Sequence, residues 1–162
     1  MNPLKFVPVA RAMAGLSYDP STQVGAVILD DDSNILSTGF NGFPRGVYDA
    51  PARYLDRETK LKYISHAEAN AVAQAARVGA RLLGSTLVLT SLYPCSNCAK
   101  LIIQAGITRV FAPHMPDDSK WHDEKLISEV MFEEAGVEVV FYDGNFPDGQ
   151  KSSIDAHTPL KA

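Results

Sequence analysis

The chain carries three side chains that can share one metal ion, in two short segments that its fold must bring together. The first segment is His66-Ala67-Glu68 and the second is Pro94-Cys95-Ser96-Asn97-Cys98. One imidazole and two thiols supply ligands that suit zinc, and they leave the fourth position of a tetrahedral site open for water. Glu68 is better suited to carrying protons than to serving as the fourth ligand. We therefore expect a catalytic zinc site with His66, Cys95 and Cys98 as ligands.

Each segment has a simpler explanation when it is considered alone. His-Ala-Glu is compatible with an ordinary helix start, in which Glu68 complements the helix dipole. The two cysteines could be small buried apolar residues or a redox-active disulfide pair. A structural zinc site would use a fourth protein ligand, which His114 or His122 could supply. The joint occurrence of both segments favours the catalytic site.

The composition fits one globular domain without a nucleic-acid or membrane partner. The 162 residues include 46% hydrophobic and 21% charged residues, and the formal net charge is −4. Nucleic-acid binding domains present a basic surface, whereas the loose cluster of cations over residues 53–62 is interrupted by acidic residues. No apolar run approaches the roughly 20 residues that span a bilayer, and no secretory leader is recognised. We expect a cytoplasmic protein.

The pattern of apolar and turn residues predicts an α/β fold. The expected helices cover residues 3–16, 66–78, 95–105 and 123–135, and the expected strands cover residues 24–29, 35–40, 86–90, 109–112 and 137–142. Residues 42–65 are expected to form a long binding loop with one helical turn around residues 57–62. This order predicts a five-stranded mixed sheet with helices on both faces, formed by residues 1–143. Residues 144–162 are expected to be a polar C-terminal appendage.

Both metal-ligand segments are expected at the start of a helix, where free backbone N–H groups favour thiolates. Zinc lowers the pKa of a bound water toward about 7. Glu68 could take the water proton, transfer it to a ring nitrogen and then protonate a departing amine. The combination of His-x-Glu with Pro-Cys-x-x-Cys is the signature of zinc nucleobase deaminases. It predicts hydrolytic removal of an exocyclic amine from a base.

Beyond these segments the chain resembles deoxycytidylate (dCMP) deaminases of the cytidine-deaminase-like superfamily. The similar segments are Asp19-Pro20-Ser21-Thr22-Gln23-Val24-Gly25-Ala26-Val27, Gly39-Phe40-Asn41-Gly42-Phe43-Pro44-Arg45-Gly46, Lys62-Tyr63, residues 99–107 and Lys120-Trp121-His122-Asp123. The resemblance implies a three-layer α/β/α cytidine-deaminase-like fold. It also implies hydrolytic deamination of dCMP to dUMP and ammonia, with one catalytic zinc ion.

The resemblance implies which residues contact the substrate nucleotide. Asn41 would bind the sugar, and Ala67 would line the substrate site. The residues near the phosphate would be Lys120, Trp121 and His122. From the residues alone, Asn41 could instead be a turn residue in the left-handed conformation. The segment 120–122 could equally be a solvated loop with one anchoring aromatic ring.

The resemblance further implies regulation and assembly, because members of this family are commonly hexamers regulated by dCTP and dTTP. The residues placed near such an effector, with its Mg²⁺, would be Gly42, Phe43, Arg45 and Arg77. From the residues alone, Arg77 could simply complement the dipole at the end of its helix. The expected partners are therefore a small nucleotide substrate, dCTP or dTTP as effectors, and further copies of the chain.

Three differences from the family pattern lie around the nucleotide rather than around the zinc. Tyr18 replaces a lysine, Trp121 replaces a tyrosine, and the loop is expanded around residues 115–119. They leave open a deaminase of a modified or differently phosphorylated cytosine nucleotide, of a free nucleoside or of a tRNA adenosine, although the acidic charge balance argues against tRNA. A catalytically silent nucleotide-binding regulator is also compatible with the pattern, but such a protein has no need of Glu68.

Overall fold

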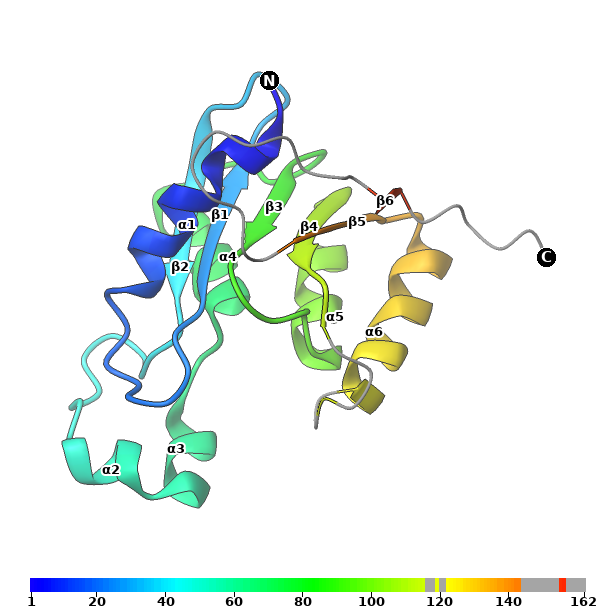
Figure 1. Cartoon of the computed structure of the whole chain (residues 1–162). Helices are drawn as coiled ribbons and strands as arrows, with labels where there is room; N and C mark the ends of the chain where they lie inside the picture. Colours follow the sequence, from blue (N-terminus) through cyan, green and yellow to red (C-terminus); the bar gives the residue numbers. More distant parts are fainter. Residues whose placement is uncertain (116–118, 120–121, 144–154, 157–162) are drawn as a thin grey trace.

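The computed structural model describes residues 1–115, 119 and 122–143, together with the backbone of residues 155 and 156. Its centre is a mixed sheet in the order β2-β1-β3-β4-β5-β6 (Figure 1). The strands are β1 Gly25–Leu29, β2 Ile35–Phe40, β3 Thr86–Leu89, β4 Arg109–Pro113, β5 Glu138–Tyr142 and β6 Asp155–Ala156. β1 pairs antiparallel with β2 and β3, whereas β3, β4 and β5 are parallel, and β6 pairs antiparallel with β5.

Helices cover both faces of the sheet and divide the core into two clusters (Figure 1). The first face is covered by η1 Pro3–Phe6 and α1 Val7–Ala14, and the second by α4 Ala67–Val78, α5 Ser96–Gln104 and α6 His122–Ala135. Because successive strand residues point to opposite faces, Ala26 and Ile28 belong to the cluster with α4, whereas Val27 and Leu29 belong to the cluster with α1. The expected three-layer α/β/α architecture is confirmed.

The connection between β2 and α4 holds more helix than expected. Two short helices, α2 Pro51–Leu55 and α3 Arg57–Tyr63, lie together beyond one end of the sheet (Figure 1). The single expected turn corresponds to α3, so the prediction for this segment was wrong about α2. Local signals for both helices exist: α2 begins at a proline, and the Asp56 side chain accepts hydrogen bonds from Glu58 N and Thr59 N at the start of α3.

Small residues allow α4 to lie directly on β2. A Cβ atom added to Gly39 would lie 2.2 Å from Ala67 O and 2.5 Å from Ala71 N, which leaves no space for a larger residue. Ser37 Oγ donates to Ala71 O at 2.7 Å, and Asn70 Nδ2 donates to a β2 carbonyl at 2.7 Å. Backbone contact and two hydrogen bonds therefore fix the first half of α4 against the sheet.

The remaining expectations for the elements agree with the structure, since the other helices and strands begin and end within two residues of their expected bounds. β6 adds a two-residue strand from the C-terminal segment to the edge of the sheet. The boundary between residues 143 and 144 stays a prediction, because the other residues of 144–162 lie outside the described residues. Within the described ranges, no helix combines the length and apolar character needed to cross a membrane.

Candidate active site

His66, Cys95 and Cys98 form the group of metal-ligating side chains that the described residues bring together. The Nδ1 atom of His66 lies 3.5 Å from Cys95 Sγ and 3.5 Å from Cys98 Sγ, and all three ligand atoms lie within 4.8 Å of one another. Zinc bonds of about 2.05 Å to nitrogen and about 2.3 Å to sulfur, at a tetrahedral angle, give an N···S separation of about 3.6 Å. The three side chains therefore fit a zinc ion.

The same geometry decides between the alternatives for this group. Cys95 and Cys98 are both free thiols, so the structure has no disulfide bond between them. His114 and His122 are both described, yet neither belongs to the group. A closed structural site with a fourth histidine is therefore absent from the described part of the chain, and a fourth position remains for a small molecule.

Both ligand segments lie where a helix begins, as expected. His66 is the N-cap of α4 with φ −74° and ψ 158°, and Cys95 is the N-cap of α5 with φ −71° and ψ 168°. Extended backbone at this position leaves the first N–H groups of each helix free to interact with negative charge. Cys98 follows in the first turn of α5. The positive ends of two helix dipoles therefore lie beside the thiolates.

An acidic side chain that the sequence analysis did not single out contacts the start of α5. Glu124, in the first turn of α6, accepts a hydrogen bond from Ser96 N at 3.1 Å. Hydrogen bonding from Ser96 lowers the pKa of the Glu124 carboxyl. The bond ties α6 to the helix that carries both cysteines. Its partners are 28 residues apart in the chain, so no local pattern could have revealed it.

One of the two thiols, Cys95, carries negative charge readily even without a metal. The hydrogen bond from Cys98 lowers the pKa of Cys95 to about 4, with a further contribution from His66. The same hydrogen bond, together with burial, raises the pKa of Cys98. Hydrogen bonding to Cys95 raises the pKa of His66. The pair thus shares one negative charge, and a divalent cation would favour deprotonation of the second thiol.

Glu68 lies in the first turn of α4 and is only 4% exposed. Burial raises the pKa of its carboxyl to about 7, against opposing contributions from a backbone N–H and from His66. A carboxyl that takes up and releases a proton near neutral pH suits a proton carrier. The role of Glu68 as the proton carrier stays a prediction.

A cavity of about 450 Å³ opens beside the metal ligands, a size suited to a small molecule. We call His66, Glu68 and Cys95 its metal side, and Ser21, Arg57 and Lys60 its α3 side. The other lining residues are Asp19, Pro20, Thr22, Val24, Asn41, Tyr54, Leu55, Leu61, Ile64, Ala67, Leu92, Tyr93, Pro94, Glu124 and Lys125. The cavity therefore joins the metal centre to the loop after α1 and to the two short helices.

Asn41 lines this cavity and is buried, at 5% exposure. Its Oδ1 accepts a hydrogen bond from Val24 N at 2.8 Å, and its Nδ2 donates to Thr22 O at 2.8 Å. Ser33 is the non-glycine residue with positive φ among those described, so the alternative of a left-handed turn at Asn41 is wrong. An amide offers two donors and two acceptor lone pairs, and half of this capacity remains for a sugar. Sugar binding by Asn41 stays a prediction.

The structure tests little of the expected phosphate segment. Lys120 and Trp121 lie outside the described residues. His122 is the first residue of α6 and does not belong to the cavity lining, whereas Glu124 and Lys125 from the same helix do. Ala67, the first residue of α4, lines the cavity as expected. The roles assigned to residues 120–122 stay predictions.

The residues expected near a regulatory nucleotide lie along the loop after β2 and on α4. Gly42 forms an isolated antiparallel bridge with Ser65. Phe43 stacks on Tyr54 with ring centroids 4.1 Å apart. Arg45 donates a hydrogen bond to Gln74 Oε1, one helical turn before the exposed Arg77. The structure thus brings Arg45 to α4 near Arg77, whereas Phe43 is part of an aromatic stack.

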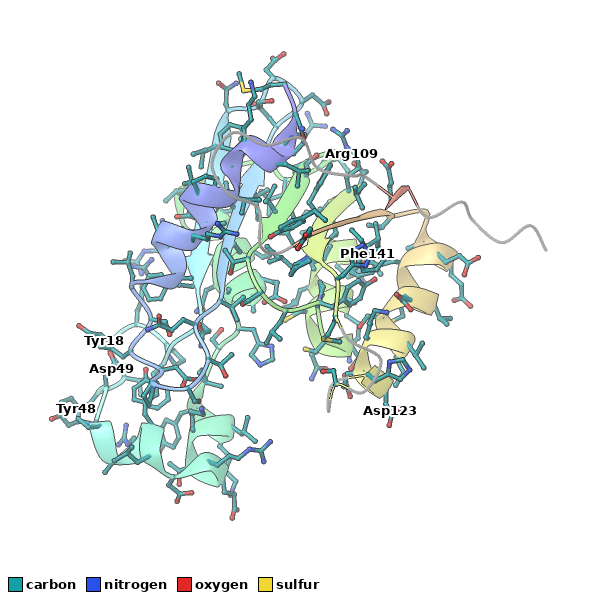
Figure 2. The ribbon with its side chains drawn as sticks, in the orientation of Figure 1. Tyr18, Tyr48, Asp49, Arg109, Asp123 and Phe141 are labelled. Atoms are coloured by element: carbon teal, nitrogen blue, oxygen red, sulfur yellow. The ribbon has the colours of Figure 1, made fainter. Side chains whose placement is uncertain are left out.

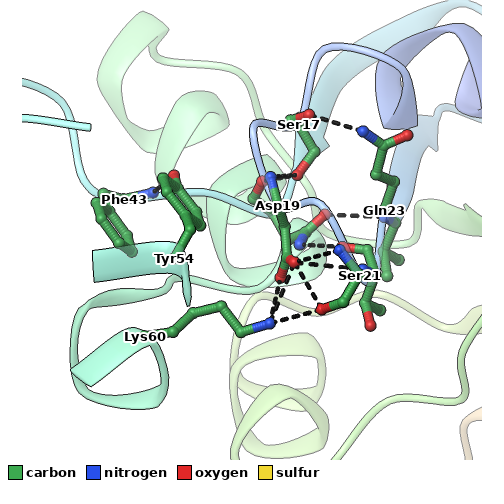
Figure 3. A network of polar contacts seen from close by, with 10 residues as sticks. Ser17, Asp19, Ser21, Gln23, Phe43, Tyr54 and Lys60 are labelled. Atoms are coloured by element: carbon green, nitrogen blue, oxygen red, sulfur yellow. Dashed lines mark hydrogen bonds and ion pairs between the residues drawn. The ribbon is translucent and has the colours of Figure 1, made fainter. Parts of the chain in front are cut away.

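A polar network around the buried Asp19, on the α3 side, was not anticipated from the sequence (Figure 3). Lys60 Nζ lies 3.1 Å from Asp19 Oδ2 and donates to Ser21 Oγ at 2.7 Å. The Asp19 carboxylate also accepts from Ser21 N at 2.9 Å and Thr22 N at 3.3 Å. By contrast, Tyr18 is 72% exposed and lies with Tyr48 on the outer side of these loops (Figure 2).

Comparison with known proteins agrees with this geometry. Residues 2–113 match the family model of the cytidine and deoxycytidylate deaminase zinc-binding region. An uncharacterized deaminase of Aliivibrio fischeri is 43% identical over 139 residues, which is 85% of this chain and 90% of that protein. The deoxycytidylate deaminase of Mus musculus is 40% identical over 142 residues, which is 83% of this chain and 76% of that protein.

The fold is also found in a solved structure with nucleotides bound. The dCMP deaminase of cyanophage S-TIM5, in complex with dCMP and dUMP, has a TM-score of 0.69 at 26% identity. The match covers 87% of this chain and 98% of the phage chain. The family model includes both ligand segments, and the relatives match over most of their own length. The chain therefore belongs to the family of cytidine and deoxycytidylate deaminases.

Proposed function

We propose that this protein is a zinc-dependent deaminase that converts dCMP and water to dUMP and ammonia. The observation that carries the proposal is the convergence of His66, Cys95 and Cys98, with His66, Cys95 and the buried Glu68 in the wall of a cavity of about 450 Å³. Relatives named deoxycytidylate deaminases, and a similar structure in complex with dCMP and dUMP, support the choice of substrate. We further propose that the enzyme acts in the cytoplasm.

The metal-side residues divide the chemistry between them. His66 Nδ1 and the two thiolates would hold zinc, which supplies Lewis acidity that activates water for attack on the carbon bearing the amine. Glu68 would accept the proton of the attacking water and pass it to the adjacent ring nitrogen. It would then take the proton of the hydroxyl group now on that carbon and deliver it to the amine, which leaves as ammonia while a carbonyl forms. Burial of Glu68 keeps its carboxyl able to hold a proton between these steps.

The nucleotide contacts and the regulation are finer parts of the same proposal. We assign the substrate contacts to Asn41, Ala67, Lys120, Trp121 and His122. We assign an effector site for dCTP or dTTP with Mg²⁺, in a hexamer of this chain, to Gly42, Phe43, Arg45 and Arg77. Burial of Asn41 and Ala67 in the cavity wall supports the first set. The proximity of Arg45 to the α4 turn that precedes Arg77 supports the second.

Ammonia release by purified, zinc-loaded protein tests the function. The substrates to compare are dCMP, 5-methyl-dCMP, dCTP, deoxycytidine, cytosine and a tRNA anticodon stem with adenosine. We expect the highest kcat/KM for dCMP. A large preference for the methylated nucleotide or for dCTP would replace the substrate while leaving the reaction unchanged. Turnover of none of them, with zinc bound and nucleotide binding intact, would identify a silent regulator.

A further inference from the structure

The residue at the N-cap of α4 does not cap the helix with its side chain. N-cap residues are commonly Ser, Thr, Asp or Asn, whose side-chain oxygen accepts a hydrogen bond from an N–H group of the first turn. His66 makes no such bond, and its Nδ1 atom faces the two cysteine sulfurs instead. His66 is also exposed, so close packing contributes little to its position. Contacts of the backbone must therefore fix the point from which the imidazole projects.

The side chain of Asn70 holds the chain immediately before His66. Its Nδ2 donates to Phe40 O at 2.7 Å and makes a longer hydrogen bond to Ser65 O at 3.4 Å. Both acceptors are carbonyl oxygens, so these bonds use the two N–H donors of the amide and fix its orientation. Phe40 is the last residue of β2, and Ser65 directly precedes His66. Asn70 thus links the end of β2 to the residue before the metal ligand.

The backbone of Asn70 holds the other side of His66. Asn70 N donates to His66 O at 2.9 Å, so the peptide groups before and after His66 are both bound by one residue. Gly42 fixes Ser65 further, because Ser65 N donates to Gly42 O at 2.8 Å and Gly42 N donates to Ser65 O at 3.0 Å. The extended backbone of His66 lies between these contacts, and they determine where its side chain begins.

We propose that Asn70 is a positioning residue for the zinc site, which holds the His66 imidazole where it converges with Cys95 and Cys98. The inference rests on the proposed function, because it concerns the proposed zinc ion. Asn70 is not part of the cavity lining, so it acts through Ser65 and His66 rather than on the substrate. Both thiols belong to the α5 segment. A displacement of His66 alone would therefore change the separation between its nitrogen and the two sulfur atoms.

Ser37 provides a matched control on the same strand and helix. Its Oγ donates to Ala71 O at 2.7 Å, so it also joins β2 to α4 through a hydrogen bond as short as the shorter one of Asn70. This bond involves neither Ser65 nor His66. Ser37→Ala and Asn70→Ala should therefore have similar effects on stability, whereas Asn70→Ala alone should disturb the imidazole. Alanine is the strongest helix former, so α4 tolerates it at position 70.

The experiment measures metal binding and stability in the wild type and in both variants. Chelator competition gives the affinity for zinc, and the absorption spectrum of the Co²⁺-loaded protein reports the geometry of the ligands. Urea titration of the metal-free protein gives the unfolding midpoint without stabilisation by bound metal. We expect similar decreases of the midpoint in both variants. Zinc affinity should fall about tenfold or more in Asn70→Ala, as substitutions around metal ligands do, and should stay at the wild-type level in Ser37→Ala. The Co²⁺ spectrum should change in Asn70→Ala alone.

Two results would overturn the role of Asn70. The first is zinc affinity that is equal in the two variants, whether both lose it or both keep it. The second is an Asn70→Ala protein that does not fold without metal, as measured by far-UV circular dichroism. Asn70 would then be a requirement of the fold and not a residue that positions His66.

Turnover of dCMP separates this inference from the proposed function. If zinc affinity falls in Asn70→Ala alone, yet the zinc-loaded wild type does not deaminate dCMP, the positioning role stands and the proposed reaction is wrong. If the wild type deaminates dCMP and the two variants bind zinc equally well, the reaction stands and the positioning role is wrong.

Discussion

The cavity buries one carboxylate on each side, and the two have opposite acid–base behaviour. Glu68 on the metal side is 4% exposed, and burial raises the pKa of its carboxyl to about 7. Asp19 beside α3 is 2% exposed, yet its pKa is lowered, because hydrogen bonds from Ser21 and Lys60 outweigh the effect of burial. Burial thus dominates at Glu68 and leaves a proton carrier, whereas the surrounding donors dominate at Asp19 and leave a permanent anion.

The contrast extends to what each residue contributes to the fold. Asp19 shapes the loop after α1 and holds Lys60, so its charge is part of the architecture. Glu68 has a buried carboxyl whose charged form is disfavoured, so its presence costs stability and is retained for chemistry. Substitutions should therefore separate the two sides of the cavity: activity falls without instability on the metal side, whereas stability falls on the α3 side.

The largest effect is expected for Glu68→Gln. Loss of the proton carrier should lower kcat for dCMP by about 10²- to 10⁴-fold, while zinc content and unfolding free energy remain at the wild-type level. Stopped ammonia assays, zinc analysis and urea titration measure the three quantities. Glu134→Gln, an exposed substitution on α6, is the control. Retained turnover in Glu68→Gln would show that Glu68 is not the proton carrier. A large loss of stability would contradict the expectation that Glu68, unlike Asp19, does not stabilise the fold.

A loss of stability is expected for Asn41→Ala. The substitution leaves Val24 N and Thr22 O without their buried partner, and each unsatisfied group costs about 1–3 kcal/mol. We expect the free energy of unfolding to fall by about 2–4 kcal/mol, measured by urea titration of the zinc-loaded protein. Asn34→Ala, at an exposed turn, should cost about 0.5 kcal/mol or less. An equally small loss of unfolding free energy in Asn41→Ala would mean that the Asn41 amide does not stabilise the fold.

A smaller, pH-dependent effect is expected for Asp19→Asn. The lowered pKa of Asp19 means that its charge stabilises the folded state above the unfolded-state value of 3.8, and that this stabilisation is lost as the pH falls through the lower folded-state pKa. At pH 7 the variant should be less stable than the wild type by about 1–3 kcal/mol, the cost of weakened hydrogen bonds to a charged group. The difference should shrink below about pH 4. Chemical denaturation between pH 7 and pH 3 measures it, and a constant difference would contradict the assignment.

The smallest effect is expected for Glu124→Ala. The substitution removes the acceptor for Ser96 N at the start of the cysteine-bearing helix. We expect zinc affinity to fall about tenfold, as loss of an outer hydrogen bond around a metal site does, and chelator competition measures the change. Asp123→Ala removes an exposed charge from the same turn of α6 without this bond, so it should leave zinc affinity unchanged. Equal effects of both variants would indicate a general charge effect.

The metal side could be predicted from the sequence because the residues of each ligand segment lie close together in the chain. His66 with Glu68, and Cys95 with Cys98, are separated by one helical turn or less, and each pair begins a helix that apolar spacing also indicates. The strands were predictable for a similar reason, since runs such as β1 are buried on both faces.

The α3 side could not be predicted in the same way. Lys60 and Asp19 lie 41 residues apart, and their pairing depends on how α3 is placed on the loop after α1. Neither residue belongs to a pattern that distinguishes a buried ion pair from two solvated charges. Asn41 was attributed to the sugar by resemblance, but its hydrogen bonds to the backbone of residues 22 and 24 required the folded loop.

The contact between Gly39 and α4 makes the strand beneath the helix a spacer for the metal ligands. Ala67 O lies where a side chain at position 39 would begin, one residue after His66. Any substituent there would displace the start of α4 outward and carry the imidazole away from two sulfur atoms that belong to a different helix. The affinity for zinc would then depend on the distance between the sheet and α4. A residue that never touches the ion would thus set how closely its three ligands can converge.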